Sequence, residues 1–286
     1  MLLGADFDQF FIKTIKTLSP YLDEIVCGGG VASALYRFHK YARNVPFGYL
    51  GTKDFDAFVP PNLPAKDRPP LLELLKQAGF QERFFGSGES PVVKYVPTDS
   101  PFGTDLEFLC AATGVLGSRN RKVVAHPIQK GVLAQPLRYL EVPLKSYPCE
   151  MELRRVPEFH EIKDITVNIP NPTAYVFQKI LIRDQGRAQA SKDKDCFYIY
   201  EISVVFRDAM DWLREEYDRL APCHVNWKKR FAREIRLLFA SEDSEGPLAA
   251  ADLVADSGGT IESGDRMITT EVVCRSVDKL ITSLLD

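Results

Sequence analysis

Residues 25–59 read IVCGGGVASALYRFHKYARNVPFGYLGTKDFDAFV, and this stretch decides the fold of the N-terminal half. Residues 22–27 predict a first strand that ends at the three glycines, and residues 52–59 predict a second strand carrying Asp54 and Asp56. Side chains alternate between the two faces of a strand, so these carboxylates point the same way. Two like charges this close are unfavourable unless a cation lies between them, and a divalent ion meets that need.

The glycine turn and the acidic strand each allow two interpretations. Gly29 and Gly30 let the backbone approach a ligand closely, and the amides that begin the helix predicted over 31–41 favour an anion such as phosphate. Short glycine patterns also form tight turns that bind nothing. In the same way, Asp54 and Asp56 suit either a metal ion or a solvated strand surface.

A second acidic pair follows on a later strand. Helices are predicted at 6–18 and 68–79, and strands at 80–85, 92–96, 104–110, 142–144, 151–156 and 160–169. The strand at 104–110 carries Asp105 and Glu107. If it neighbours the strand at 52–59 in one sheet, Asp54, Asp56 and Glu107 converge. Three carboxylates can hold two divalent ions, which would clamp the phosphates of a nucleotide and activate an acceptor hydroxyl.

The pattern changes from strand-rich to helix-rich near Pro170, where we place a domain boundary. The fold class predicted is α+β: a mixed sheet with flanking helices over 1–168, followed by a mainly helical domain over 169–286. Asn171 is the predicted N-cap of the first helix of that domain, with Pro172 at its first position. Further helices are predicted within 193–220, at 227–240, at 247–254 and at 270–285. Ligand sites favour domain interfaces, so a nucleotide is expected between the two domains.

Cations gather at the start of the helical half. Lys179 lies among apolar residues of a helix, where an ammonium is costly unless it reaches solvent or meets an anion. A polar segment with Arg187, Lys192 and Asp195 follows, and it is either a phosphate-binding loop or a solvated loop of mixed charge. The basic helix at 227–240 is either an RNA-contacting surface or an ordinary amphipathic helix.

These motifs together resemble the nucleotidyltransferase superfamily to which DNA polymerase beta belongs. The resemblance is carried by Gly29-Gly30 with the helix that follows, by Thr52-Lys53-Asp54-Phe55-Asp56, and by Leu106-Glu107-Phe108. Within the superfamily, the chain is most similar to the bacterial minimal group that includes the AbiEii/MenA-type toxins. The matching cations in the second half are Lys179, Arg187 and Lys192.

The resemblance implies an enzyme that transfers a nucleoside monophosphate from an NTP to a hydroxyl of RNA, protein or a small molecule and releases pyrophosphate. It implies Mg²⁺ or Mn²⁺ on three catalytic acids: Asp54, Asp56 and Glu107, with Asp105 as a rival for the third. The nucleotide contacts implied are Gly29, Gly30, Thr52, Lys53, Lys179, Arg187 and Lys192. A tRNA or a protein is the expected macromolecular acceptor.

Three departures from the family pattern motivate an alternative. Leu50 stands where an arginine is expected, Val31 where a small hydroxyl residue often follows the glycines, and Glu107 where aspartate is usual. The alternative is a catalytically inactive protein on the same fold that binds a nucleotide or a partner.

Composition narrows the class of protein. The net charge is only −3, which gives no general attraction for nucleic acid, so no DNA partner is expected. No run of 18 apolar residues predicts a membrane span, and the N-terminus lacks the pattern of a signal peptide. The six cysteines form no C-x-x-C pair, which predicts free thiols rather than zinc. We expect a cytoplasmic protein.

Overall fold

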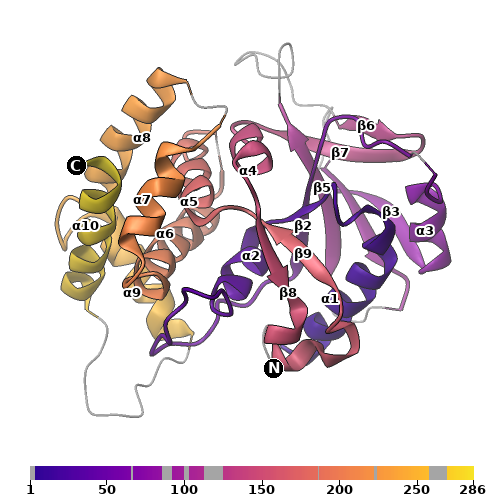
Figure 1. The fold of residues 1–286 in the computed structure, drawn as a ribbon, viewed down its shortest axis with the longest axis horizontal. Coiled ribbons are helices and arrows are strands. Elements are labelled where there is room, and N and C mark those ends of the chain that lie inside the picture. The colour runs from indigo at the N-terminus through magenta and orange to yellow at the C-terminus, as the bar shows by residue number, and fades with distance from the viewer. Residues whose placement is uncertain are drawn as a thin grey trace. The chain divides into compact units, whose positions relative to one another are not determined.

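The computed structural model describes residues 4–65, 67–85, 92–99, 103–112, 125–185, 187–221, 224–257 and 269–286. The chain forms two compact units: Met1–Leu35 with Gly51–Pro170, and Tyr36–Leu50 with Asn171–Asp286. The first unit contains a mixed sheet with flanking helices and the second is helical (Figure 1). The predicted α+β fold class is therefore confirmed. The segment 36–50 belongs to the helical unit although it precedes most of the sheet in sequence.

The first unit is built on one sheet. Among the described residues the strand order is β3-β4-β5-β2-β1-β9-β8, with β7 beside β5 and β6 beside β7. The strands are β1 Val26–Cys27, β2 Asp54–Val59, β3 Phe80–Phe85, β4 Val92–Pro97, β5 Asp105–Ala111, β6 His126–Gln129, β7 Val132–Leu137, β8 Cys149–Glu152 and β9 Thr166–Ile169. The central strands β2 and β5 run parallel, and β1 runs antiparallel to β2.

Helices cover one face of this sheet. Phe11 of α1 (Ala5–Leu18) packs against Phe55 of β2, with 5.7 Å between ring centroids, and stacks on Phe159 at 4.4 Å. Phe159 belongs to a 3-10 helix, Pro157–Ile162, and α3 (Leu71–Gln77) also contacts α1. Because Phe55 points toward α1, the alternating Asp54 and Asp56 point to the opposite face.

The opposite face is apolar toward the carboxyl ends of β2 and β5. Val26, Phe58, Leu109, Ala111 and Leu140 form a buried cluster there, with Leu144 packed against it. Leu140 directly precedes α4, Glu141–Lys145, and Leu144 lies within it. The predicted strand at 142–144 was therefore wrong: Leu140 and Leu144 are four residues apart, so a helical turn places both against the sheet.

Other element bounds differ from the predictions. β1 is two residues long, and α2 runs Gly29–Tyr36 instead of 31–41. The expected strand at 160–169 begins only at Thr166, because the 3-10 helix occupies the residues up to Ile162. The predicted strand at 151–156 ends at Glu152, where another 3-10 helix, Leu153–Arg155, begins.

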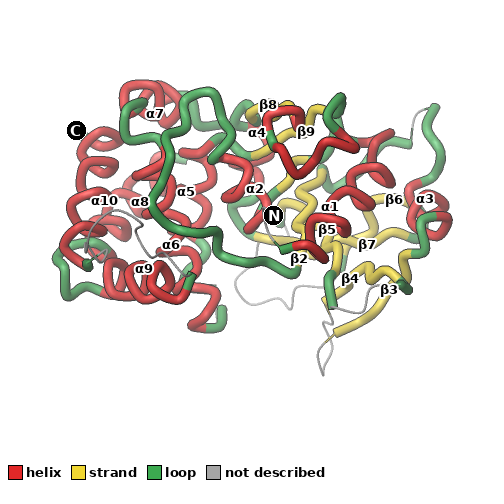
Figure 2. Tube along the Cα trace, turned by 90° about the horizontal axis from the view of Figure 1, so that it is seen from below, coloured by secondary structure: helices red, strands yellow, loops and turns green. Residues whose placement is uncertain are grey.

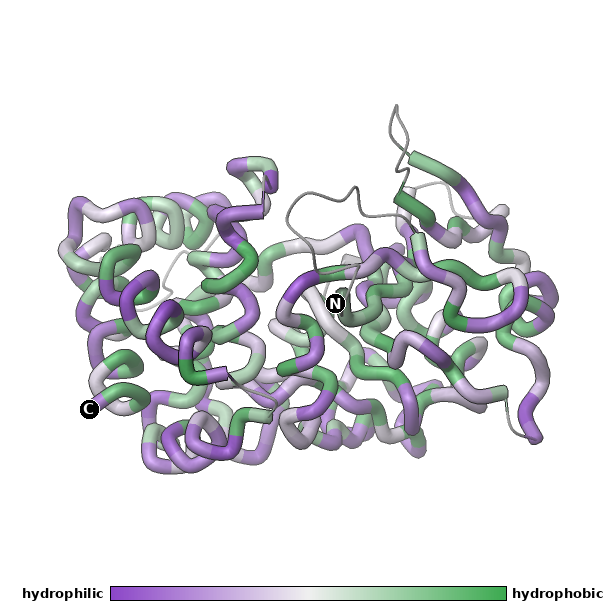
Figure 3. The backbone as a smooth tube through the Cα atoms, turned by 90° about the horizontal axis from the view of Figure 1, so that it is seen from above, coloured by the Kyte–Doolittle hydropathy of each residue, from purple (hydrophilic) through white to green (hydrophobic). Residues whose placement is uncertain are grey.

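The second unit is helical in all its described elements, as Figure 2 shows in red. The helices are α5 Pro172–Leu181, α6 Gln189–Val205, α7 Met210–Asp218, α8 Val225–Leu238, α9 Glu245–Asp256 and α10 Thr270–Leu285. Asn171 is the N-cap of α5, as predicted: its side-chain oxygen accepts hydrogen bonds from Thr173 N at 2.9 Å and Thr173 Oγ1 at 2.8 Å. Hydrophobic and hydrophilic segments both occur along α10, which leads to the C label of Figure 3, and its buried residues recur at helical spacing.

Arg37 joins the segment 36–50 to α6. Its guanidinium donates to Glu201 Oε1 at 2.6 Å and to the carbonyl oxygens of Phe47 and Gly48 at 2.8 Å each. The guanidinium also lies 4.1 Å from the ring centroid of Tyr49. Because the guanidinium and the Glu201 carboxylate are both buried, this pair fixes the path of the chain after α2.

The cysteines in the described part of the chain are free thiols: Cys27, Cys110, Cys149, Cys196 and Cys274. Cys223 lies outside the described residues. Burial raises the pKa of the Cys27 thiol to about 12, so this group stays protonated at neutral pH. Among the described helices, none has both the length and the apolar character needed to cross a membrane.

Candidate functional site

Four carboxylates lie side by side on one face of the sheet. The parallel register of β2 and β5 pairs Asp54 with Asp105 and Asp56 with Glu107. Paired residues point to the same face, and the alternation of each strand keeps all four side chains there. The structure thus brings the predicted acids together with Asp105, and we call these four residues the acid cluster.

A lysine from the neighbouring strand lies within the acid cluster. The Lys94 ammonium is 2.5 Å from Glu107 Oε1, 3.0 Å from Asp105 Oδ1 and 3.5 Å from Asp54 Oδ1. The antiparallel pairing of β4 with β5, with Tyr95 opposite Leu106, sets this position. Sequence reasoning missed Lys94, although a single lysine inside the apolar strand Val92–Pro97 was a signal that could have identified it.

Burial and mutual repulsion alter the acidity of this cluster. Burial raises the pKa of Asp105 to about 6, against the opposing hydrogen bond from Lys94. Burial also raises the pKa of Glu107, again opposed by Lys94. Lys94 itself has a raised pKa, since contacts with Glu107, Asp105 and Asp54 outweigh its burial. The ammonium is therefore the charged partner that keeps several carboxylates together.

The glycine turn lies directly beside Asp56. The amide of Gly28 donates to the carbonyl oxygen of Asp56 at 2.8 Å. Gly29 has a φ of +54°, and a Cβ there would lie 1.9 Å from Asp56 Oδ2. Any larger residue at this position would collide with that carboxylate. The glycines thus permit close approach of the Asp56 side chain as well as a left-handed backbone.

The other predicted residues of this region lie at the start of β2. Thr52 Oγ1 donates to the Asp54 carbonyl at 3.2 Å, so its hydroxyl shapes the entry to the strand. Lys53 is exposed, and its carbonyl accepts a hydrogen bond from the Asp105 amide at 3.1 Å. Gly30 lies in the first turn of α2. These residues lie in or beside the strands and helix that carry the acid cluster.

The donor set fits one magnesium-type ion on the Asp54 and Asp56 side of the cluster. Carboxylate oxygens are ligands that Mg²⁺ prefers, and proteins commonly bind this ion through one or two carboxylates while substrate phosphates and waters complete the shell. Half of the Asp54 side chain is exposed, so a phosphate could reach it. Within the described residues, no group of three or more acidic, histidine or cysteine side chains is arranged to hold an ion alone.

Two of the three predicted cations of the helical unit lie around one buried carboxylate. Lys179 Nζ lies 2.9 Å from Asp195 Oδ1, and Arg187 forms an ion pair with Asp195 Oδ2. The Asp195 side chain is 1% exposed. The Lys179 ammonium also lies 5.2 Å from the ring centroids of Tyr175 and Tyr198. The anion that Lys179 was expected to meet is thus provided by the protein itself.

Lys192 is not part of this arrangement. It is half-buried in the first turn of α6, and its carbonyl oxygen accepts a hydrogen bond from Arg183 at 2.7 Å. The basic helix α8 has acidic partners: Arg230 pairs with Asp184, and Arg236 pairs with Asp286. These pairs support the amphipathic interpretation of α8.

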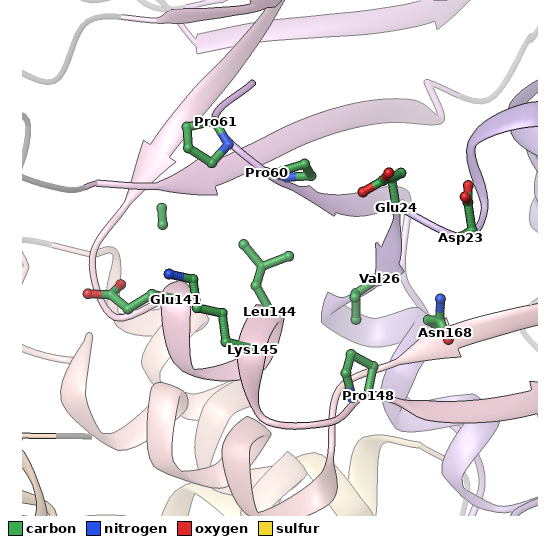
Figure 4. Close-up of a pocket in the computed structure, with 11 residues that line it drawn as sticks. Asp23, Glu24, Val26, Pro60, Pro61, Glu141, Leu144, Lys145, Pro148 and Asn168 are labelled. Atoms are coloured by element: carbon green, nitrogen blue, oxygen red, sulfur yellow. The ribbon is translucent and has the colours of Figure 1, made fainter. Parts of the chain in front are cut away.

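A pocket of about 340 Å³ lies near the carboxyl ends of β2 and β5 (Figure 4). Its lining is a mixture of apolar and charged residues: Asp23, Glu24, Val26, Pro60, Pro61, Ala111, Glu141, Leu144, Lys145, Pro148 and Asn168. Asp54 and Asp56 lie nearer the start of the same strand that leads to Pro60. The pocket and the acid cluster are thus separate features of the first unit.

Comparison with known proteins assigns the family. A family model described as Nucleotidyltransferase matches residues 10–220, which span the whole acid cluster, the glycine turn and the Lys179–Asp195 pair. A comparison with curated proteins finds no match. The family match covers well over half of the chain and agrees with the mixed sheet, the glycine turn and the paired acidic strands. The chain therefore belongs to this nucleotidyltransferase family.

Proposed function

We propose that this protein is an active, metal-dependent nucleotidyltransferase that moves a nucleoside monophosphate from an NTP to a hydroxyl acceptor. The observation that carries the proposal is the pairing of Asp54 with Asp105 and of Asp56 with Glu107 beside the glycine turn, in a chain of this family. Nucleotidyl transfer needs closely placed negative ligands for the cation that neutralises the phosphate charge.

The proposed roles follow the geometry. Asp54 and Asp56 hold Mg²⁺ or Mn²⁺, which when bound neutralises phosphate charge and orients the acceptor. Glu107 is the proposed third acid, with Asp105 as its rival. The acceptor oxygen forms a bond to the α-phosphorus, the bond to the bridging oxygen breaks, and pyrophosphate leaves. The hydroxyl proton passes to a carboxylate of Asp56 or Glu107.

The proposed nucleotide contacts lie at two places in the chain. Gly29, Gly30, Thr52 and Lys53 lie in or beside the elements of the acid cluster and would bind the phosphates. Lys179, Arg187 and Lys192 would add positive charge from the helical unit. Two cations around the single carboxylate of Asp195 leave a surplus of positive charge, which favours an anion.

The proposal also includes a class of acceptor and an alternative function without catalysis. The resemblance to the AbiEii/MenA-type group favours a tRNA or a protein as acceptor. Leu50 and Val31, which replace expected family residues, favour the alternative of a protein that binds a nucleotide without turnover. Labelled NTPs incubated with total RNA and with protein separate the two, since only an active enzyme transfers label to a macromolecule.

Calorimetry tests the site itself. A non-hydrolysable NTP analogue is titrated into wild type and into Asp54→Ala/Asp56→Ala, with and without Mg²⁺. We expect magnesium-dependent binding by wild type and at least a tenfold weaker affinity in the double variant. Asp99→Ala is the control, because Asp99 is an exposed acid of the same unit that pairs only with Lys13 among the described residues. Equal binding by wild type and the double variant would refute the proposed metal site.

A further inference from the structure

Lys94 lies within the acid cluster and so limits how many further cations can bind there. An ammonium has three N–H donors. Lys94 lies within 3.5 Å of carboxylate oxygens of Glu107, Asp105 and Asp54, and it donates to both oxygens of Asp105. Its side chain is 18% exposed, so solvent contributes little to its environment. The ammonium therefore lies among three carboxylates that would otherwise be open to a divalent ion.

A divalent ion and the ammonium cannot share this place. Mg²⁺ binds oxygen at about 2.1 Å, so an ion bound to Asp105 and Glu107 together would come into contact with the Lys94 nitrogen that hydrogen-bonds to both. The two positive charges would also repel each other strongly in this half-buried place. The second acidic pair is thus closed to a metal ion for as long as Lys94 stays there.

The first acidic pair is arranged differently. Asp56 lies on the side of the glycine turn, where Gly29 approaches its carboxylate. Asp54 is half-exposed and is the most distant of the three carboxylates around Lys94. These two acids are the proposed ligands of an ion that arrives with the phosphates of a nucleotide. The cluster therefore has one place for a divalent ion and one place that a lysine fills.

We infer that Lys94 is a built-in cation that takes the place of a second metal ion, so that the site works with a single divalent ion held by Asp54 and Asp56. This inference rests on the proposed function, because it concerns the metal site of that reaction. In this arrangement Asp105 and Glu107 position the Lys94 ammonium, in place of the metal-binding role that the resemblance implies for Glu107 or its rival Asp105.

The number of bound ions tests the inference directly. Electron paramagnetic resonance counts the Mn²⁺ ions that bind to the full chain together with each molecule of a non-hydrolysable NTP analogue. We expect one Mn²⁺ in wild type and two in Lys94→Met, which removes the charge and keeps an unbranched side chain of similar length. Lys16→Met is the control, because Lys16 is half-exposed in the same unit and pairs with Glu161. This variant should bind one Mn²⁺, like wild type.

Two results would overturn the inference. One is two Mn²⁺ per bound nucleotide in wild type, which needs no variant and so decides the question even if Lys94→Met fails to fold. The other is an equal number of ions in wild type and folded Lys94→Met. Failure of the proposed function looks different, because neither wild type nor Lys94→Met would then bind the nucleotide and Mn²⁺ together.

Discussion

The two charged clusters of this molecule are opposite in composition. In the sheet unit, four carboxylates share one face with Lys94, the one cation paired with them among the described residues. In the helical unit, the two cations Lys179 and Arg187 share the single carboxylate of Asp195. The first cluster therefore has an excess of negative charge and attracts cations, whereas the second has an excess of positive charge and attracts anions.

The two clusters also differ in how deeply their carboxylates are buried. Half of the Asp54 side chain is exposed, but only 1% of the Asp195 side chain is. Water or a ligand can compensate a charge at Asp54, whereas Asp195 depends entirely on Lys179 and Arg187. The two groups of ion pairs should therefore respond differently to substitution: water can replace a lost partner at the half-exposed Asp54, whereas it cannot reach the buried Asp195. Substitutions in each cluster test this contrast.

The largest effect is expected from Asp195→Ala. The change leaves Lys179 and Arg187 without their shared carboxylate, and the loss of one partner from a buried ion pair costs about 3–5 kcal/mol of folding free energy. Urea unfolding followed by circular dichroism measures this cost. Asp193→Ala is the matched control, since Asp193 lies two residues earlier on α6 and accepts only an exposed hydrogen bond from Gln189. Similar losses in the two variants would show that Asp195 is not the buried support described here.

A smaller effect is expected from Gly29→Ala. The residue has a φ of +54°, and its Cβ would meet Asp56 Oδ2 at 1.9 Å, so the change combines backbone strain with displacement of the carboxylate. We expect a loss of about 1–3 kcal/mol in unfolding free energy and weaker Mn²⁺ binding in the presence of the nucleotide analogue. Gly51→Ala is the control, because a Cβ there meets no atom within 4 Å. An unchanged stability in Gly29→Ala would contradict the close approach.

The sequence was sufficient to predict features that depend only on residues close together in the chain. Alternation along a strand was enough to place Asp54 and Asp56 on one face, and the polar side chain before Pro172 was enough to predict the cap at Asn171. The partner of Lys94 could not be predicted, because it depends on the register of β4 against β5, which long-range packing sets. For the same reason the sequence left open whether Lys179 reaches solvent or meets an anion, and it did not show that Asp195 supplies that anion.

The mistaken strand at 142–144 has a related cause. A run of three residues fits either a strand or a turn of helix, and only the apolar cluster around Phe58 and Leu109 selects the helix that directs Leu140 and Leu144 toward it. Tertiary packing thus overrides weak local preference in short segments. The long helix at 270–285 shows the opposite case, since its apolar stripe was sufficient to predict both of its ends.

The smallest loss of folding free energy is expected from Lys16→Ala, because this change breaks an exposed ion pair instead of a buried one. Lys16 and Glu161 form an ion pair in which both side chains are about half exposed. Exposed pairs contribute about 0–1 kcal/mol because water and salt screen them. Urea unfolding at low and high salt measures the cost, which should be near the error of the method and smaller still at high salt. If Lys16→Ala lost nearly as much folding free energy as Asp195→Ala, burial would not explain which ion pairs stabilise this protein. The contrast between the two clusters would then rest on their opposite charge alone.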